Sequence, residues 1–408
     1  LGISLILAAR HLVGVLRLGT PLLIGRLADR KTFCLVTFLL SGLLLFCLPF
    51  VAAPGVIHSA GMSLAALVAI WSLHHLMQYV GMIALYSWLA DLVPLRIRGR
   101  FFGYRERRLV AGEAAAAITS GLFTYWWRTE YKDFPHLQWI GYAISAGLGA
   151  LVMIAAIVPL WFMPRAEAVS TTPSSIDWKV LTKPFSDSRF VRLLLFGCWF
   201  SFSNGLTQSV QNTYPAQVLG ISLFVMLALQ TGMRLGQLSI SPELGRMADQ
   251  IGNKAVMLFC LILTAQGPLF YFFSTPQSPW WFVGAWILWI AYAGMNVALP
   301  NLMLKLAPGQ SGATTNRPCS ARCPSVPGLS ASASNTPYIA AYFTLTGLCY
   351  AANTILGGWL FDHYRLSTFN FFGSTIDYNQ WIFLVGWIAR CLGILALLLV
   401  IEPRTQKK

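Results

Sequence analysis

The chain has 408 residues, of which 56% are hydrophobic and only 11% are charged. Soluble domains carry roughly 25% charged residues, so this composition excludes an ordinary soluble protein and favours a membrane protein. The formal net charge is +15, but the basic residues form short clusters between apolar runs, and none is long enough to build a nucleic-acid-binding surface.

Apolar runs of membrane-crossing length follow one another along the whole chain. About twenty helical residues span a hydrocarbon core of roughly 30 Å, and these runs are too long for the strands of a membrane barrel. The expected fold is therefore all-α and polytopic. Eleven helices are predicted, at residues 1–24, 33–53, 63–92, 108–127, 138–162, 190–214, 218–242, 255–274, 281–304, 337–361 and 380–401.

The first predicted helix ends at the charged turn "GRLADRK", which contains Gly25, Asp29 and Arg30. Arg17 lies inside that helix, where an ionisable side chain needs a partner or a cavity. The chain begins at Leu1 rather than Met, and the end of this helix at the charged turn is expected to be cytoplasmic. A truncation that removed an earlier helix would explain both features.

The third predicted helix contains "WSLHHLMQY", which places His74, His75, Gln78 and Tyr79 on or near one face. These side chains are candidate substrate contacts, and either histidine could carry a proton near neutral pH. The alternative is that they form hydrogen bonds that hold helices together without binding a solute.

A basic stretch, "RIRGRFFGYRERR", follows and is predicted as a loop that includes Arg98 and Arg100. In the next helix, Glu113 is the only acidic residue well inside a predicted span. Its carboxylate could pair with a cation on another helix, or it could reach back to Arg107 or Arg108 in the preceding loop.

Residues 163–189 are polar and rich in proline, as expected of a linker between two bundles. The helix that follows contains Asn204 and Gln208, and a later helix contains Tyr292 and Asn296. These four polar side chains are further candidates for a substrate cavity, with helix–helix hydrogen bonding again as the alternative.

A second copy of the charged turn, "GRMADQIGNK", contains Gly245 and Asp249, and Arg234 lies in the helix before it. Such a repeat predicts two related halves. We therefore expect an N-terminal bundle at 1–162, a cytoplasmic linker at 163–189 and a C-terminal bundle at 190–408. Their alignment gives five helices to the first half and six to the second, so eleven of an expected twelve helices are visible.

Residues 312–334 form a low-complexity segment without an acidic residue, and we expect it to be a disordered insertion. Its cysteines, Cys319 and Cys323, lack the further ligands that a zinc site needs, so no metal and no cofactor are predicted.

The 29 Lys and Arg residues fall mostly on one side when the connections are assigned alternately to the two faces. This bias marks the basic side as cytoplasmic. The opposite loops are short and contain no Asn-x-Ser/Thr sequon, which favours a bacterial inner membrane over a eukaryotic cell surface.

With "GRLADRK", its echo and "RIRGR" at these places, nearly the whole chain resembles the major facilitator superfamily. The family turn has a second glycine that the first copy lacks. The resemblance implies two six-helix halves that rock around a central site. It also implies that Asp29 locks the halves on the cytoplasmic side, against the segment near Thr336 and against Arg98 or Arg100.

The resemblance further implies that the helices of Glu113 and Arg234 face each other, so these residues are predicted to form an inner gate. Arg17 lies at a similar depth. The candidate cavity residues named above fall on helices that would line the central cavity of this family.

These features predict a secondary active transporter of a small solute, with proton coupling as an option, and not an enzyme. A polytopic membrane enzyme and a transporter-like fragment without transport activity are the alternatives. The expected partners are the solute and membrane lipid, the expected oligomeric state is a monomer, and no nucleic acid is expected.

Overall fold

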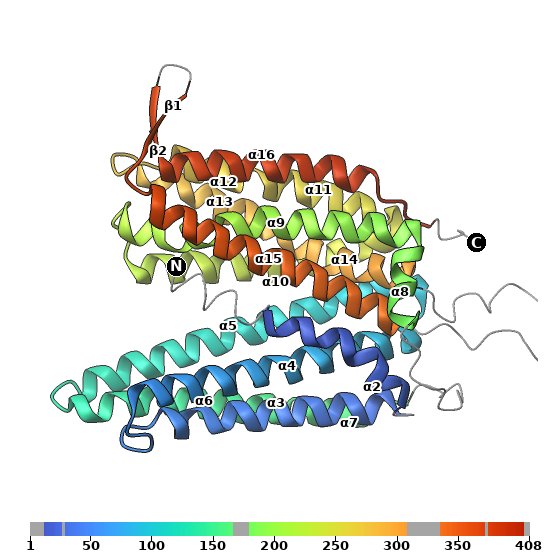
Figure 1. The fold of residues 1–408 in the computed structure, drawn as a ribbon, viewed down its shortest axis with the longest axis horizontal. Coiled ribbons are helices and arrows are strands. Elements are labelled where there is room, and N and C mark those ends of the chain that lie inside the picture. The colour runs from blue at the N-terminus through green and yellow to red at the C-terminus, as the bar shows by residue number, and fades with distance from the viewer. Residues whose placement is uncertain (1–11, 27–28, 166–178, 308–334, 372–373, 404–408) are drawn as a thin grey trace, which may run out of the picture.

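The computed structural model describes residues 12–26, 29–165, 179–307, 335–371 and 374–403. Figure 1 shows two groups of long helices lying side by side, the earlier part of the chain in blue to blue-green and the later part in yellow-green to red. The described residues are mainly helical, which confirms the all-α, polytopic fold class.

The first helix group is composed of the elements up to α7. In chain order they are η1 (Gly14–Gly19), α2 (Thr20–Arg26), α3 (Arg30–Ala52), α4 (Ala60–Leu92), η2 (Leu95–Ile97), α5 (Arg98–Glu130), η3 (Pro135–Leu137), α6 (Gln138–Ala155) and α7 (Ile157–Phe162).

After the short α8 (Lys179–Ser186), the second helix group contains the remaining elements. They are α9 (Ser188–Gln217), α10 (Leu223–Ile251), α11 (Asn253–Ala265), α12 (Gly267–Phe273), η4 (Pro279–Trp281), α13 (Phe282–Leu288), η5 (Trp289–Ala291), α14 (Tyr292–Leu306), α15 (Thr336–Tyr364), β1 (Thr368–Phe371), β2 (Ser374–Asp377) and α16 (Tyr378–Leu398).

Seven helical stretches among the described residues are both long and apolar enough to cross a membrane. The helices α5, α9 and α10 are more polar, but at 33, 30 and 29 residues they exceed the length that a bilayer requires. They run alongside the apolar helices within their groups (Figure 1). The chain is therefore an integral membrane protein.

Prolines break two of the predicted helices. A proline has no N–H to donate and its ring clashes with the preceding turn, so it interrupts a helix or bends it. The predicted helix at 138–162 is divided at Ala156, shortly before Pro159. The helix at 255–274 is divided at Gln266, before Pro268. Both divided pairs still continue in one direction along the bundle (Figure 1).

The sequence prediction was wrong about the start of α5, which begins at Arg98 rather than at 108. The basic stretch is thus helical and not a loop, in keeping with the good helix propensity of arginine and glutamate. Arg107 and Arg108 lie on this helix, as does a further acidic residue, Glu106. Glu113 is therefore not the only acidic residue inside a helix.

Two other predictions concern connections. The external loop at 362–379 contains an antiparallel hairpin that the sequence did not predict, with Thr368 paired to Asp377 and Phe371 to Ser374. The expected insertion at 312–334 and the first residues of the chain, 1–11, lie outside the described residues.

The same lysine contact occurs once in each helix group. At the start of α3, Lys31 Nζ donates to the carbonyl oxygens of Trp161 and Met163, at 2.6 and 2.7 Å. At the start of α11, Lys254 Nζ donates to those of Leu398 and Val400, both at 2.7 Å. Each lysine thereby forms hydrogen bonds with the end of the last helix in its group, α7 or α16.

The helices beside these lysines begin with different caps. Asp29 is the N-cap of α3, and its carboxylate accepts from the Lys31 backbone N–H at 3.0 Å. At the start of α11 the N-cap is Gly252, at φ 101°, which cannot cap with a side chain. Glu402, from beyond α16, supplies the carboxylate and accepts from the backbone N–H groups of Asn253 and Lys254, at 3.0 and 2.7 Å.

Burial raises the pKa of the Glu402 carboxyl, but other contacts outweigh it. Hydrogen bonds from the backbones of Lys254 and Asn253, a hydrogen bond from the Asn253 side chain and the charge of Lys305 hold this pKa below its ordinary value. Lys305 Nζ lies 3.0 Å from Glu402 Oε1.

One hydrophobic core joins the two helix groups. Ile83, Tyr86 and Phe102 of the first group belong to the same buried cluster as residues of α9, α10, α11, α14 and α15. Two further cores lie within single groups, one around Trp88 and one around Tyr271. The joining residues come from the end of α4 and the start of α5. The contact therefore lies at the end of the bundle that carries the basic stretch with Arg98 and Arg100, here called the basic end.

Candidate functional site

The two helix groups meet most closely where α5 crosses α10. Two glycines of α5, Gly99 and Gly103, face Gly245 of α10. A Cβ built on Gly245 would lie 2.5 Å from the carbonyl oxygen of Gly99, which is closer than real side chains approach a backbone. These glycines therefore allow backbone-to-backbone packing between the groups.

The carboxylate of Asp249 crosses this junction and caps α5. Its Oδ1 accepts from the backbone N–H of Gly99 and its Oδ2 from that of Arg100, both at 2.8 Å. The start of a helix has free N–H groups and a partial positive charge, so a carboxylate there is favourable. The aspartate of the second charged turn thus links the two groups.

Asp29, at the first charged turn, does not occupy the position that the resemblance implied. Its carboxylate caps α3 in its own group and lies 3.4 Å from Arg165 Nε. Thr336 meets Ser87 instead, with 2.9 Å between their hydroxyl oxygens. The physical reason is local: α3 begins directly after Asp29, so the carboxylate is used at its own helix start.

The basic residues of this region have several different roles. Arg98 is buried and donates to the carbonyl oxygens of Ala90 and Val93 at the end of α4. Arg30 Nη1 binds Asp91 Oδ2 at 2.5 Å. Arg100 joins the Asp249 contact through its backbone. Gly25 lies in α2.

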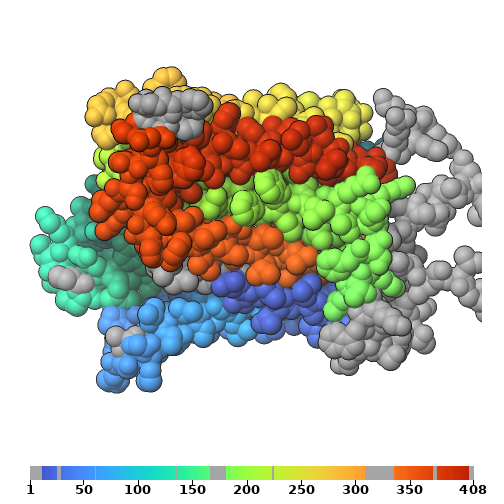
Figure 2. All heavy atoms as spheres, turned by 45° about the horizontal axis from the view of Figure 1, so that its top comes forward, coloured from blue at the N-terminus to red at the C-terminus, as the bar shows by residue number. Residues whose placement is uncertain are grey.

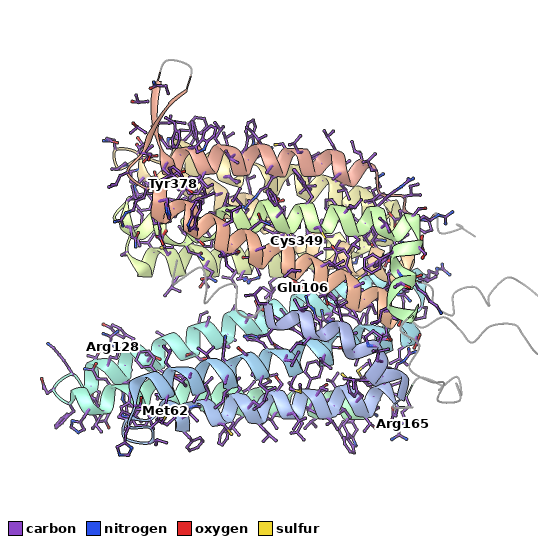
Figure 3. All side chains as sticks on the ribbon, in the orientation of Figure 1. Met62, Glu106, Arg128, Arg165, Cys349 and Tyr378 are labelled. Carbon is purple, nitrogen blue, oxygen red and sulfur yellow. The ribbon has the colours of Figure 1, made fainter. Side chains whose placement is uncertain are left out.

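Glu106 lies where the two groups meet (Figure 3) and has 7% of its surface exposed. Its Oε1 accepts from Asn296 Nδ2 of α14, in the second group, at 2.9 Å. Its neighbour Arg105 lies over the ring of Tyr86, 5.4 Å from the centroid. The predicted cavity residue Asn296 is therefore bound to a buried carboxylate.

Glu113 and Arg234 are close together, with 3.4 Å between Glu113 Oε2 and Arg234 Nη2. Both side chains are partly exposed. Arg234 also donates to Gln237 Oε1 at 3.0 Å, and Gln237 in turn donates to the carbonyl oxygen of Trp289. The pair lies seven residues further along α5 than Glu106, on the same face of the helix.

Arg17 forms the contact on the other side of the junction. It has 5% of its surface exposed, and its Nε donates to Thr344 Oγ1 of α15 at 3.3 Å. Its guanidinium also lies over the rings of Tyr79 and Phe343, at 4.9 and 5.9 Å. Figure 2 shows the orange α15 resting along the dark blue segment that contains Arg17.

The histidines of α4 face different neighbours. His74 is buried, and its Nδ1 lies within hydrogen-bonding distance of Ser41 in α3. This side chain therefore lies in the α3–α4 contact and not toward the second group. His75 is less buried; its Nδ1 is 3.2 Å from Gln78 Oε1 and its ring stacks on Tyr79, which also contacts Arg17.

The remaining predicted cavity residues belong to the second group. Tyr292 donates its hydroxyl to Asn204 Oδ1 at 2.8 Å, which joins α14 to α9. Asn204 Nδ2 also donates to the carbonyl oxygen of Phe200, so both the oxygen and the nitrogen of its side-chain amide form hydrogen bonds. Gln208, one turn further along α9, is partly exposed.

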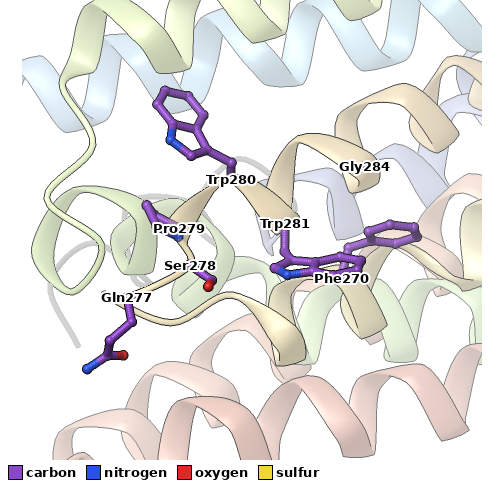
Figure 4. Close-up of a pocket in the computed structure, with 7 residues that line it drawn as sticks. All are labelled: Phe270, Gln277, Ser278, Pro279, Trp280, Trp281 and Gly284. Carbon is purple, nitrogen blue, oxygen red and sulfur yellow. The ribbon is translucent and has the colours of Figure 1, made fainter.

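A hollow of about 510 Å³ lies at the opposite end of the second group, around the turn between α12 and α13 (Figure 4). Its lining includes Phe270, Gln277, Trp280 and Trp281, and it contains none of the predicted site residues. Both tryptophans are exposed, as is common where a helix bundle reaches the membrane–water boundary. Among the described residues no group of three His, Cys, Asp or Glu side chains could hold a metal ion.

Sequence reasoning missed Glu106 and the cap that Asp249 places on α5. A signal for Glu106 was present, since Glu106 and Glu113 lie two helical turns apart and would share a face of a continuous helix. The loop assignment of the arginine-rich stretch concealed it. The cap depends on a contact between segments far apart in the sequence, which no local pattern reveals.

Comparisons with known proteins agree with this arrangement. The family model described as the Major Facilitator Superfamily matches residues 1–316. No curated protein sequence matches the chain.

Three solved structures illustrate the similarity of fold. The proton:xylose symporter XylE, bound to 6-bromo-6-deoxy-D-glucose, has 14% identity and a TM-score of 0.64 over 98% of this chain and 86% of its own. The human organic anion transporter MFSD10 has 14% identity and a TM-score of 0.64 over 96% and 83%. A variant of the E. coli fucose:proton symporter FucP has 11% identity and a TM-score of 0.67 over 98% and 92%.

Proposed function

The chain belongs to the major facilitator superfamily, and from this premise we propose that it is a secondary active transporter that moves a small solute across the membrane by alternating access. The two helix groups are the units that rock against each other, and the linker expected at 163–189 connects them. The bacterial inner membrane and a monomeric state are part of the same proposal.

The observation that carries the proposal is the position of the contacts between the groups. Most of them involve the first part of α5 and α15, the last part of α4 and α10, and α14, at the end of the bundle that carries the basic stretch. The Glu113–Arg234 pair lies further along α5, toward the middle of the bundle. A carrier closed at its cytoplasmic end and open to the outside would have this distribution of contacts. The family and the similar structures are transporters, which favours transport over a membrane enzyme.

Asp249 holds this end closed, so replacing it tests the rocking. In Asp249→Asn the charged cap on α5 is lost, and we expect the groups to separate more often at the basic end. The measurement is the maleimide labelling rate of Thr344→Cys, a buried position at the junction, in a background without native cysteines. Labelling should become faster. Glu243→Gln, on the same helix, should not change it, because Glu243 pairs with Arg246 within α10.

Transport itself is measured with the purified chain in vesicles, against sugars and organic anions first, since these are the solutes named for the similar structures. Uptake of one class that stops when Asp249→Asn is introduced would support the carrier. If no solute moves while the labelling change is still seen, the chain is a transporter-like protein without transport, the alternative that the sequence left open.

We assign proton coupling to Glu106. It is the buried carboxylate at the junction, and its partner Asn296 belongs to the other group, so that contact has to break when the groups separate. Glu106→Gln should remove the dependence of uptake on the pH gradient but keep exchange of solute at equal pH. The matched control is Glu113→Gln, whose carboxylate is half-exposed. Loss of the pH dependence in the control alone would overturn this assignment.

A further inference from the structure

Arg390 is a buried cation inside the second helix group. It lies in α16 with 2% of its surface exposed, and its Nη2 donates to Thr207 Oγ1 of α9 at 3.2 Å. Its Nε and Nη1 have no hydrogen-bond partner within the described part of the chain. A buried guanidinium without a counter-charge is strongly unfavourable, so these two nitrogens indicate that something else binds there.

The surroundings of Arg390 offer further donors. Gln211 lies one turn after Thr207 on the same face of α9, and its Nε2 is buried with no partner among the described residues. The charge of Arg390 also reaches Tyr271 of α12, which stacks on Trp289 at 5.7 Å. Trp289 Nε1 is a further buried donor without a described partner. Guanidinium and indole groups can only donate, so donors predominate in this cluster, where only hydroxyl and amide oxygens could accept.

The fold does not require an arginine at this place. Arg390 precedes Leu398 by the same number of residues as Met153 precedes Trp161, and Leu398 and Trp161 accept the equivalent contacts from Lys254 and Lys31. By this count Met153 is the counterpart of Arg390, although the helix of the first group is divided at Ala156, between Met153 and Trp161. The arginine is therefore explained by a ligand better than by packing.

The ligand must be small. A Cβ on Gly386, one turn before Arg390, would clash with the side chain of Thr207, so α9 and α16 lie close together beside the cluster. We infer that Arg390, Thr207 and Gln211 bind one monovalent inorganic anion of about the size of chloride within the second helix group. This anion is the counter-ion of Arg390, and its binding does not depend on the proposed transport.

The test measures the unfolding temperature of the purified full-length chain as chloride replaces gluconate at constant ionic strength. A saturable rise with chloride and with bromide is expected. Arg390→Met should abolish the rise or move its midpoint at least roughly tenfold higher, because a hydrogen bond to a charged group is worth about that factor. The variant carries the residue of the equivalent position and should fold.

The matched control is Arg189→Met, which removes an exposed arginine from the cytoplasmic end of α9 and should leave the chloride response unchanged. An equal chloride response in Arg390→Met and wild type would overturn the inference, and so would a rise with acetate but not with chloride. If Arg390→Met does not fold, bromide-soaked crystals of the wild type decide: an anomalous peak beside Arg390 Nη1 supports the site, and the lack of one overturns it.

Discussion

At the scale of single residues, carboxylates at helix starts have the clearest roles. Asp249 caps a helix of the opposite group, whereas Asp29 caps a helix of its own group. The sequence predicted a role for both charged turns but assigned the crossing contact to Asp29. In the first turn Asp29 is followed directly by α3, while three further residues separate Asp249 from α11, so only Asp249 is free to reach α5.

Glu402 gives a pH-dependent prediction. Its folded pKa lies below the ordinary value of about 4.3, so its charge stabilises the fold above that pH. This stabilisation is lost as the pH falls through the lower folded value. The unfolding temperature of Glu402→Gln should be reduced at pH 7, by an amount that reflects about 1.5–3 kcal/mol for hydrogen bonds to a charged group.

The difference between wild type and Glu402→Gln should shrink as the pH is lowered from 7 to 3, because acid neutralises the wild-type carboxylate. Scanning calorimetry over that range measures it. Glu243→Gln is the surface control and should show little difference at any pH. A difference for Glu402→Gln that stays constant down to pH 3 would contradict the role of its charge.

At the scale of helices, the sequence predicted where they occur better than where they begin and end. Apolar length identifies α3, α4 and α15 within a few residues. Periodic apolarity could not locate the start of α5, because its first turns are basic and their burial depends on α4 and α10. The β1–β2 hairpin was missed for a different reason: its strands are only 4 residues each, too short to show a clear alternating pattern.

The contact between α5 and α10 predicts a difference between two glycines of the same helix. A methyl group on Gly245 would press on the backbone of Gly99, whereas at Gly232 nothing lies within 4 Å. Gly245→Ala should therefore cost about 1–3 kcal/mol of unfolding free energy, as overpacking does, and should also increase the labelling of Thr344→Cys. Gly232→Ala should leave both values unchanged or slightly raise stability. Equal effects of the two variants would argue against close packing here.

At the scale of the whole molecule, the repeat of the charged turn predicts two related halves. The two lysine contacts, one in each half, allow this relation to be tested by comparing the stability that each contributes. Lys31→Met and Lys254→Met each remove two hydrogen bonds to carbonyl oxygens at the end of a last helix. Each should cost about 1–2 kcal/mol in thermal or denaturant unfolding.

The costs of the two lysine variants should be similar, and in the double variant they should add, because the sites are far apart and share no partner. A large loss in one half only would show that the two contacts are not equivalent. What the sequence could not predict at this scale is which half supplies the crossing carboxylate, since that follows from the shorter first turn and from how the groups pack.

The confinement of tight packing to one end has a mechanical consequence. A helix of 33 residues, such as α5, is about 50 Å long, so pivoting by about ten degrees at its glycine-lined end would displace the far tip by roughly 9 Å. In the proposed movement, the long helix would turn about a short contact region at one of its ends. In the proposed alternating access, small adjustments among Gly99, Gly103 and Gly245 would produce a large displacement at the opposite end of α5.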